Sequence, residues 1–207
     1  MKEKKAYKRW LYVSDTEYKV LKNTAIIVLL FFTVICTIRI IQSEGARSEG
    51  SEGVADADFT KLDLNTLDQE GHITAENLKD YDLTLINFWR TTCTFCIKEM
   101  PALNELSKEY EGRVQFIGVC EDVQKKGVVD DEKLREALHI ISTKGENFMQ
   151  TYPTAGFTEM TDQILGVPET YFVDRDGNIL KVISGAMDKA GWKNEIDGIL
   201  EDIGGEQ

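Results

Sequence analysis

Residues 83–101 read LTLINFWRTTCTFCIKEMP, and this stretch holds the strongest signals for both the fold and the chemistry. Its first residues, Leu83–Phe88, form a short apolar run that predicts a buried strand. Apolar side chains at helical spacing follow and predict a helix over residues 94–110. The chain is therefore expected to pass from a buried strand almost directly into a helix, with Cys93 and Cys96 at the junction.

The position of these two cysteines favours redox chemistry. A cysteine at a helix N-terminus faces unpaired N–H groups and the positive end of the helix dipole, which stabilise its thiolate. Two intervening residues allow both sulfurs to lie on one turn and to close a disulfide. Cys93 is nearer the helix end and is the predicted nucleophile, and Cys96 is predicted to resolve the mixed disulfide.

A C-x-x-C pair is also half of many zinc sites. Cys120, His72 and His139 could supply further ligands, but none of them is spaced as a second pair. We therefore expect no metal, and we favour a redox-active disulfide over a purely structural one. Cys120 itself ends a predicted central strand, so it is either a third sulfur of the site or a buried free cysteine. Both histidines are expected to be structural or surface residues.

The rest of the domain alternates strand and helix signals. The elements expected after residue 110 are a strand at 114–120, a helix at 130–141, a short helix at 161–165, strands at 170–173 and 179–183, and a last helix carrying Trp192, Ile196, Ile199 and Leu200. The turn Asp174–Gly177 between the last two strands is typical of a β-hairpin. This order predicts an α/β fold whose central strands are parallel and whose last pair is antiparallel.

Residues 23–42 predict a transmembrane anchor. The 17 apolar-rich residues Ala25–Ile41 would span about 26 Å as a helix, near the lower limit for crossing a bilayer. A cleaved signal peptide fits less well, because Gln42–Ala46 lack a typical small-residue cleavage site. A lipoprotein also fits less well, because Ile35 precedes Cys36.

Charge is distributed unevenly along the chain, whose net charge is −12. Residues 1–22 carry seven Lys/Arg against three Asp/Glu, which predicts a cytoplasmic basic tail and an extracytoplasmic remainder. Residues 43–58, SEGARSEGSEGVADAD, are typical of a flexible linker and leave residues 59–207 as the folded domain. Residues 43–207 hold 16 basic and 33 acidic residues, which argues against a nucleic-acid partner.

Two segments resemble one known family. Residues 85–101 resemble the active-site segment of the TlpA/ResA/CcmG family, whose pattern is N-F-W-A-x-W-C-x-x-C-x-x-E-x-P. Residues 166–177, GVPETYFVDRDG, are similar to the family's later segment, in which the proline is cis, and Pro-Glu-Thr is especially like the cytochrome c maturation members. The resemblance covers roughly residues 59–203. It implies a membrane-anchored disulfide reductase with a thioredoxin-like fold, an α/β architecture with a mixed central sheet flanked by helices.

The resemblance also assigns roles to single residues. It implies that Pro168 is a cis-proline packed against the disulfide and that the backbone of Val167 faces a bound substrate strand. Glu99, three residues after Cys96, corresponds to an acid that can exchange a proton with the buried thiol. Asn87 stands where cytoplasmic thioredoxins carry a buried aspartate, which leaves Glu99 as the better proton acceptor. The expected catalytic residues are Cys93, Cys96, Glu99 and Pro168.

The sequence departs from the family pattern beside the cysteines. The usual alanine and tryptophan before the first cysteine are Arg90 and Thr92 here, and the intervening pair is Thr94–Phe95. Because these positions tune the thiolate, the family's redox potential is not transferable. Arg90 either reaches Cys93 and favours its thiolate or is a solvated side chain. The expected substrate-binding residues are Val167, Trp89 and Arg90, with Trp89 packed beneath the site.

We therefore expect an extracytoplasmic thiol–disulfide oxidoreductase that reduces protein disulfides. The resemblance implies re-reduction by a membrane electron donor of CcdA/DsbD type, with apocytochrome c among the candidate substrates. A peroxiredoxin-like peroxidase fits less well, because its Pro-x-x-x-Thr-x-x-Cys pattern would place Ile86 and Arg90 at the proline and threonine. A non-catalytic, tethered binding module is the remaining alternative.

Overall fold

The protein is described from a computed structural model, which covers residue 23 and residues 57–145 and 148–205. Apart from Asn23, the predicted tail, anchor and nearly all of the linker lie outside the described residues, so these boundaries stay predictions. No helix within the described part of the chain is long and apolar enough to cross a bilayer.

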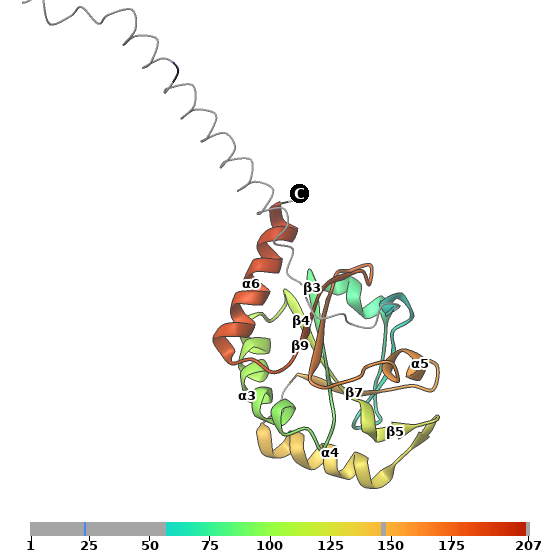
Figure 1. The fold of residues 1–207 in the computed structure, drawn as a ribbon. Helices are drawn as coiled ribbons and strands as arrows, with labels where there is room; N and C mark the ends of the chain where they lie inside the picture. Colours follow the sequence, from blue (N-terminus) through green and yellow to red (C-terminus); the bar gives the residue numbers. More distant parts are fainter. Residues whose placement is uncertain (1–22, 24–56, 146–147, 206–207) are drawn as a thin grey trace, which may run out of the picture. The chain divides into compact units, whose positions relative to one another are not determined.

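A seven-stranded mixed sheet forms the centre of the domain (Figure 1). In spatial order, its strands are β2 (His72–Thr74), β1 (Asp63–Thr66), β7 (Met149–Pro153), β4 (Val114–Cys120), β3 (Leu83–Trp89), β8 (Glu169–Val173) and β9 (Ile179–Ser184). The three central strands β7, β4 and β3 are parallel, and the other neighbouring pairs are antiparallel. A separate two-stranded ribbon joins β5 (Gln124–Lys125) to β6 (Val128–Val129).

Helices lie on both sides of the sheet. The α-helices are α3 (Thr94–Glu109), α4 (Asp131–Lys144), α5 (Thr158–Thr161) and α6 (Lys189–Gly205), and the 3₁₀ segments are Phe59–Lys61, Ala75–Asp80 and Glu121–Val123. Figure 1 shows α3 and α6 on one side of the sheet and α5 on the other. The mixed sheet between these layers confirms the predicted α/β architecture.

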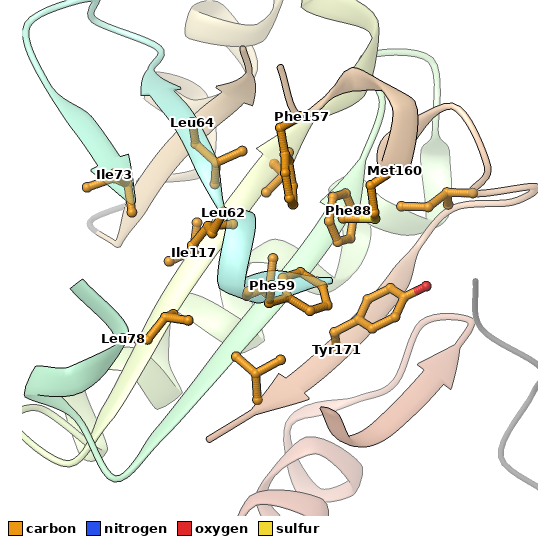
Figure 2. Close-up of a cluster of buried hydrophobic side chains, with 14 residues drawn as sticks. Phe59, Leu62, Leu64, Ile73, Leu78, Phe88, Ile117, Phe157, Met160 and Tyr171 are labelled. Carbon is orange, nitrogen blue, oxygen red and sulfur yellow. The ribbon is translucent and has the colours of Figure 1, made fainter. Parts of the chain in front are cut away.

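β3 runs through the middle of the core, and all seven of its residues are buried. Leu83 and Leu85 pack into the cluster formed with α3 and α6. Ile86 and Phe88 pack into the opposite cluster, where the Phe88 and Tyr171 rings meet edge to face (Figure 2). Because successive strand residues point to opposite faces, burial on both faces explains why five of the seven residues of this strand are apolar.

The structure confirms most of the predicted elements and corrects one. The strand at 83–88, the helix at 94–110, the strand at 114–120 and the final hairpin are all present with small shifts at their ends. The short helix predicted at 161–165 is wrong, because α5 ends at Thr161 and the chain then leads as a loop to β8. Strands β1, β2 and β7 were not predicted.

Candidate active site

The site begins where β3 ends and α3 starts. Cys93 is the N-cap residue of α3, and it is joined to Cys96 by a disulfide with a Cα–Cα distance of 5.3 Å. The backbone N–H of Cys96 donates to Cys93 Sγ at 3.1 Å. Cys93 is partly exposed, whereas Cys96 is fully buried. An external sulfur therefore has access to Cys93, as the predicted roles of the two cysteines require.

The loop that precedes β8 lies against this disulfide. The Val167–Pro168 peptide bond is cis, as expected from the resemblance. The carbonyl oxygen of Val167 lies 3.6 Å from Cys93 Sγ. The fold thus brings together two predicted site residues, Cys93 and Val167, which lie 74 positions apart in the chain.

Glu99 is a buried carboxyl group on the α3 face that points into the protein. It accepts hydrogen bonds from Asn87 Nδ2 at 3.1 Å, from the backbone N–H of Met187 at 3.2 Å and from Trp192 Nε1 at 3.2 Å. Burial raises the pKa of Glu99 to about 7, although these three donors act in the opposite direction. A group with this pKa can both accept and donate a proton at neutral pH.

Trp89, which is expected to bind substrate, does not line the surface. Its side chain is fully buried, and its indole N–H donates to Gln150 Oε1 at 3.1 Å. Gly118 faces Gln150 on the neighbouring strand, and a Cβ at this glycine would lie only 2.2 Å from Gln150 Oε1. The absence of a side chain at Gly118 leaves room for the amide that holds Trp89, which packs beneath the site.

Arg90 adopts neither of the two predicted arrangements. Its Nε donates to Glu121 Oε2 at 2.7 Å, and its Nη2 donates to the carbonyl oxygen of Ile164 at 3.4 Å. Only 6% of the Glu121 side chain is exposed. Burial raises the pKa of Glu121 to about 7, against the favourable charge of Arg90. Sequence reasoning missed Glu121, although an acid directly after a buried strand was a usable signal.

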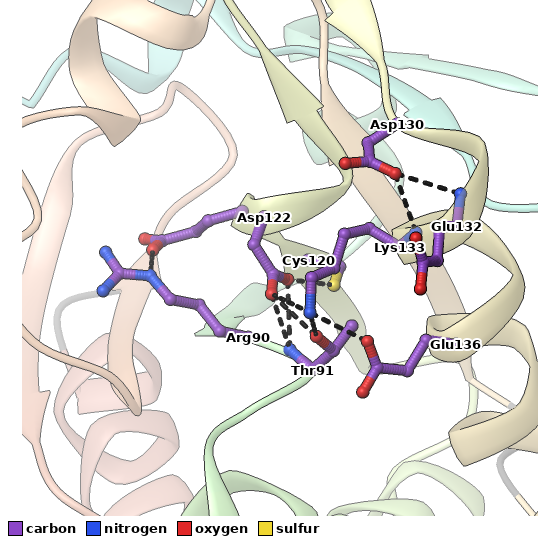
Figure 3. Close-up of polar contacts among 9 residues, drawn as sticks. Arg90, Thr91, Cys120, Asp122, Asp130, Glu132, Lys133 and Glu136 are labelled. Atoms are coloured by element: carbon purple, nitrogen blue, oxygen red, sulfur yellow. Dashed lines mark hydrogen bonds and ion pairs between the residues drawn. The ribbon is translucent and has the colours of Figure 1, made fainter.

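A second set of polar contacts, next to Arg90, holds the loop between β3 and α3 (Figure 3). Asp122 accepts hydrogen bonds from the backbone N–H of Thr91 at 3.0 Å and from its hydroxyl at 2.7 Å. Lys133, from α4, donates to Thr91 Oγ1 at 2.8 Å. Cys120 donates from Sγ to Asp122 Oδ1 at 3.3 Å, is fully buried and is not in a disulfide. These surroundings favour the buried free cysteine over a third reactive sulfur.

The surface around the disulfide carries two prominent apolar side chains. Phe95, between the two cysteines, is 67% exposed, and Leu165, in the loop before Val167, is 97% exposed. A cavity of about 450 Å³, which neither of these side chains lines, is lined mostly by charged residues, including Arg90 and Glu121. The described residues contain no group of three or more His, Cys, Asp or Glu side chains arranged to hold a metal ion.

Comparisons of sequence relate this site to known oxidoreductases. Residues 55–182 match the AhpC/TSA family. The thiol-disulfide oxidoreductase ResA of Geobacillus kaustophilus is 27% identical over 194 residues, which cover 88% of this chain and 97% of that protein. The ResA protein of Geobacillus thermodenitrificans is 30% identical over 121 residues, which cover 55% of this chain and 61% of that protein.

A solved structure supports the fold. A secreted disulfide oxidoreductase of Mycobacterium tuberculosis, described as homologous to DsbE of E. coli, matches with a TM-score of 0.54 and 17% sequence identity. The match covers 67% of this chain and 96% of that chain. At this identity the likeness concerns the fold alone, and it confirms the expected thioredoxin-like arrangement.

Proposed function

The chain belongs to the AhpC/TSA family, as a TlpA/ResA/CcmG-like thiol–disulfide oxidoreductase, and we propose that it is a membrane-anchored reductase of protein disulfides outside the cytoplasm. One observation carries the chemical part of this proposal. A partly exposed sulfur at the start of α3 is paired with a buried sulfur, and a carboxyl group with a pKa of about 7 lies one helical turn beyond the buried one.

The reaction begins with the reduced pair. The Cys93 thiolate, stabilised by the N–H groups at the start of α3, attacks one sulfur of a substrate disulfide and releases the other as a thiolate, which takes up a proton. Cys96 then loses its proton and attacks Cys93 Sγ. This second step releases the fully reduced substrate and leaves the Cys93–Cys96 disulfide. Two electrons pass from the protein dithiol to the substrate.

Glu99 serves the second step. A buried thiol is a poor nucleophile because burial disfavours its thiolate. Glu99 lies three residues after Cys96 on the same helix face, and its deprotonated form accepts the proton that Cys96 must lose. When the disulfide is reduced again, Glu99 returns this proton.

The membrane-related part of the proposal rests on the sequence. The apolar residues 23–42 follow a basic segment, and this order favours an anchor with the domain outside the cytoplasm. A domain held there needs electrons from the membrane, and a carrier of CcdA/DsbD type supplies them in this proposal. Proteins with disulfides outside the membrane are the substrates, and apocytochrome c is one candidate.

A redox titration of the full chain in thiol–disulfide buffers tests the direction of electron flow, with alkylation and mass analysis of Cys93, Cys96 and Cys120. We expect a reversible two-electron couple confined to Cys93 and Cys96, with a potential well below that of the surrounding compartment. A high potential would indicate an oxidase or isomerase instead. Rapid formation of a sulfenic acid at Cys93 by peroxide would favour the peroxidase.

The anchor requires its own experiment. Protease added to intact protoplasts that contain the full chain should remove the domain, and a control protein of the cytoplasm should survive. A domain that is protected until the membrane is lysed would contradict the proposed location.

A further inference from the structure

Arg90 connects three loops that the sequence keeps far apart. It lies between β3 and α3, its ion-pair partner Glu121 follows β4, and the carbonyl that it contacts belongs to Ile164 in the loop before β8. The family that this chain resembles usually has alanine at this position. An alanine could make neither contact, so this connection depends on the residue in which the chain departs from the pattern.

The contact with Ile164 fixes one end of a short segment that borders the reactive sulfur. The Ile164 side chain is buried in the core, so the segment is anchored at this residue. Leu165 then points outward and is 97% exposed, and the Val167 carbonyl lies 3.6 Å from Cys93 Sγ. This segment therefore borders the sulfur that a polypeptide substrate has to reach.

Glu121 holds the guanidinium group in place. Above about pH 7, where Glu121 is ionised, its buried carboxylate is costly without a counter-charge, and Arg90 Nε supplies that charge at 2.7 Å. The other oxygen of Glu121, Oε1, is buried and has no hydrogen-bond partner within the described part of the chain. The ion pair with Arg90 is therefore the main contact that compensates this carboxylate. Next to Arg90, the contacts of Thr91 with Asp122 and Lys133 hold the backbone of the same loop (Figure 3).

We propose that Arg90 is a positioning residue for polypeptide substrates: held by Glu121, it fixes the segment 164–167 beside Cys93 through the Ile164 carbonyl. Arg90 does not touch the reacting sulfurs in this arrangement. Its effect is to keep the binding surface ordered before the substrate arrives, which lowers the entropic cost of binding. The inference rests on thiol–disulfide exchange at Cys93, and it does not depend on the direction of electron flow in the cell.

Single-turnover kinetics of the reduced full chain at pH 8, where Glu121 is ionised, test this role. An extended peptide with one internal disulfide is the substrate, and the half-saturating concentration and the limiting rate are measured separately. For Arg90→Ala we expect the half-saturating concentration to rise about tenfold, while the limiting rate changes by less than about twofold. The ratio of the second-order rate constants for the peptide and for a small organic disulfide should fall by a similar factor. Arg90→Lys, which keeps the charge but not the fork of donors, should recover part of the loss.

Two further variants keep the experiment decisive. Arg90→Ala leaves the buried Glu121 carboxyl group without its counter-charge, so Arg90→Ala/Glu121→Gln carries the same test with a neutral amide in case the single variant does not fold. Arg175→Ala is the matched control, because Arg175 pairs with Asp82, which precedes the start of β3, away from the disulfide. An Arg90 variant that lowers the limiting rate as much as the affinity, or that binds the peptide like the native chain, would overturn the inference. A native chain without exchange at Cys93 would instead contradict the proposed function.

Discussion

Three cysteine sulfur atoms lie in or against one apolar cluster around Trp89, yet their surroundings give them different reactivity. Cys93 is partly exposed and caps α3, whereas Cys96 and Cys120 are fully buried. Burial raises the pKa of the Cys120 thiol well above its usual range, and the neighbouring charge of Asp122 adds to the shift. The thiolate, which is the reactive form, is therefore scarce at Cys120.

After mild reduction at pH 7, we expect iodoacetamide to modify Cys93 first and Cys120 only when the protein unfolds. The difference in rate should be at least about 100-fold, because both thiolate population and access favour Cys93. Mass analysis of digested samples taken over time gives the rate at each cysteine. Cys120 that reacts in the folded protein as fast as Cys93 would show that a third sulfur is available at the site.

Glu99 gives a second prediction for a single residue. Glu99→Gln removes the proton acceptor for Cys96, so the release of reduced substrate should slow by about tenfold or more. In the native chain, the rate of this step should rise with pH through about 7, the pKa of Glu99, and the variant should lack this inflection. Glu105→Gln is the matched control, because Glu105 is an exposed residue of the same helix that pairs with Lys189. An unchanged pH profile in Glu99→Gln would remove Glu99 from the mechanism.

At the scale of strands and helices, the contact between β4 and β7 depends on a glycine. Gly118→Ala places a methyl group where the Gln150 amide lies, so the amide must move and lose its hydrogen bond from Trp89. We expect a loss of about 1 to 3 kcal/mol in the free energy of unfolding. Urea unfolding measures this change, and Gly118→Ala/Gln150→Ala should lose less than the two single variants added together.

A glycine in α6 provides the control for this experiment. A Cβ at Gly198 would meet open space, so Gly198→Ala should stabilise the protein by about 1 kcal/mol through helix propensity. If both alanine variants change stability equally, the effect at Gly118 does not come from contact with Gln150.

The three central strands β3, β4 and β7 explain what the sequence could and could not predict. β3 and β4 are mostly apolar because both of their faces are largely buried, so their pattern was clear. β7 was missed because it contains Gln150 and Thr151, whose side chains form hydrogen bonds with partners on other strands, Trp89 and Gly118. Such partners are invisible in a local pattern of hydrophobic residues.

The pairing of Arg90 with Glu121 was missed for a related reason. The parallel register places Trp89 opposite Cys120, so the residues that follow the two strands become neighbours. The two strands were predicted and the fold was expected to pair them in parallel, but the register that brings Arg90 and Glu121 together is set by tertiary packing. By contrast, the site at Cys93 could be predicted because its signals lie within two continuous stretches, residues 85–101 and 166–177.

At the scale of the whole molecule, the thermodynamic consequence of the site is a dependence of stability on pH. Glu99 and Glu121 are both buried, and both have a pKa raised from about 4.5 to about 7. In the folded protein each carboxyl group keeps its proton up to about pH 7, whereas in the unfolded chain it loses the proton near pH 4.5. The folded state therefore binds more protons between these values, and stability must fall as the pH rises through this range.

We expect each of these two carboxyl groups to lower the free energy of unfolding by about 2 to 3 kcal/mol between pH 5 and pH 8. Glu99→Gln and Glu121→Gln should each reduce the loss of stability between pH 5 and pH 8 by about that amount. The double variant should lose nearly all of the pH dependence that these two carboxyl groups cause. Urea unfolding of the oxidised protein at several pH values gives the slopes directly. A native chain that gains stability from pH 5 to pH 8, with slopes unaffected by either substitution, would mean that neither carboxyl group holds its proton in the folded state. Glu99 would then lack the proton affinity that the proposed resolving step needs, since only a group that titrates near neutral pH can take the Cys96 proton and return it.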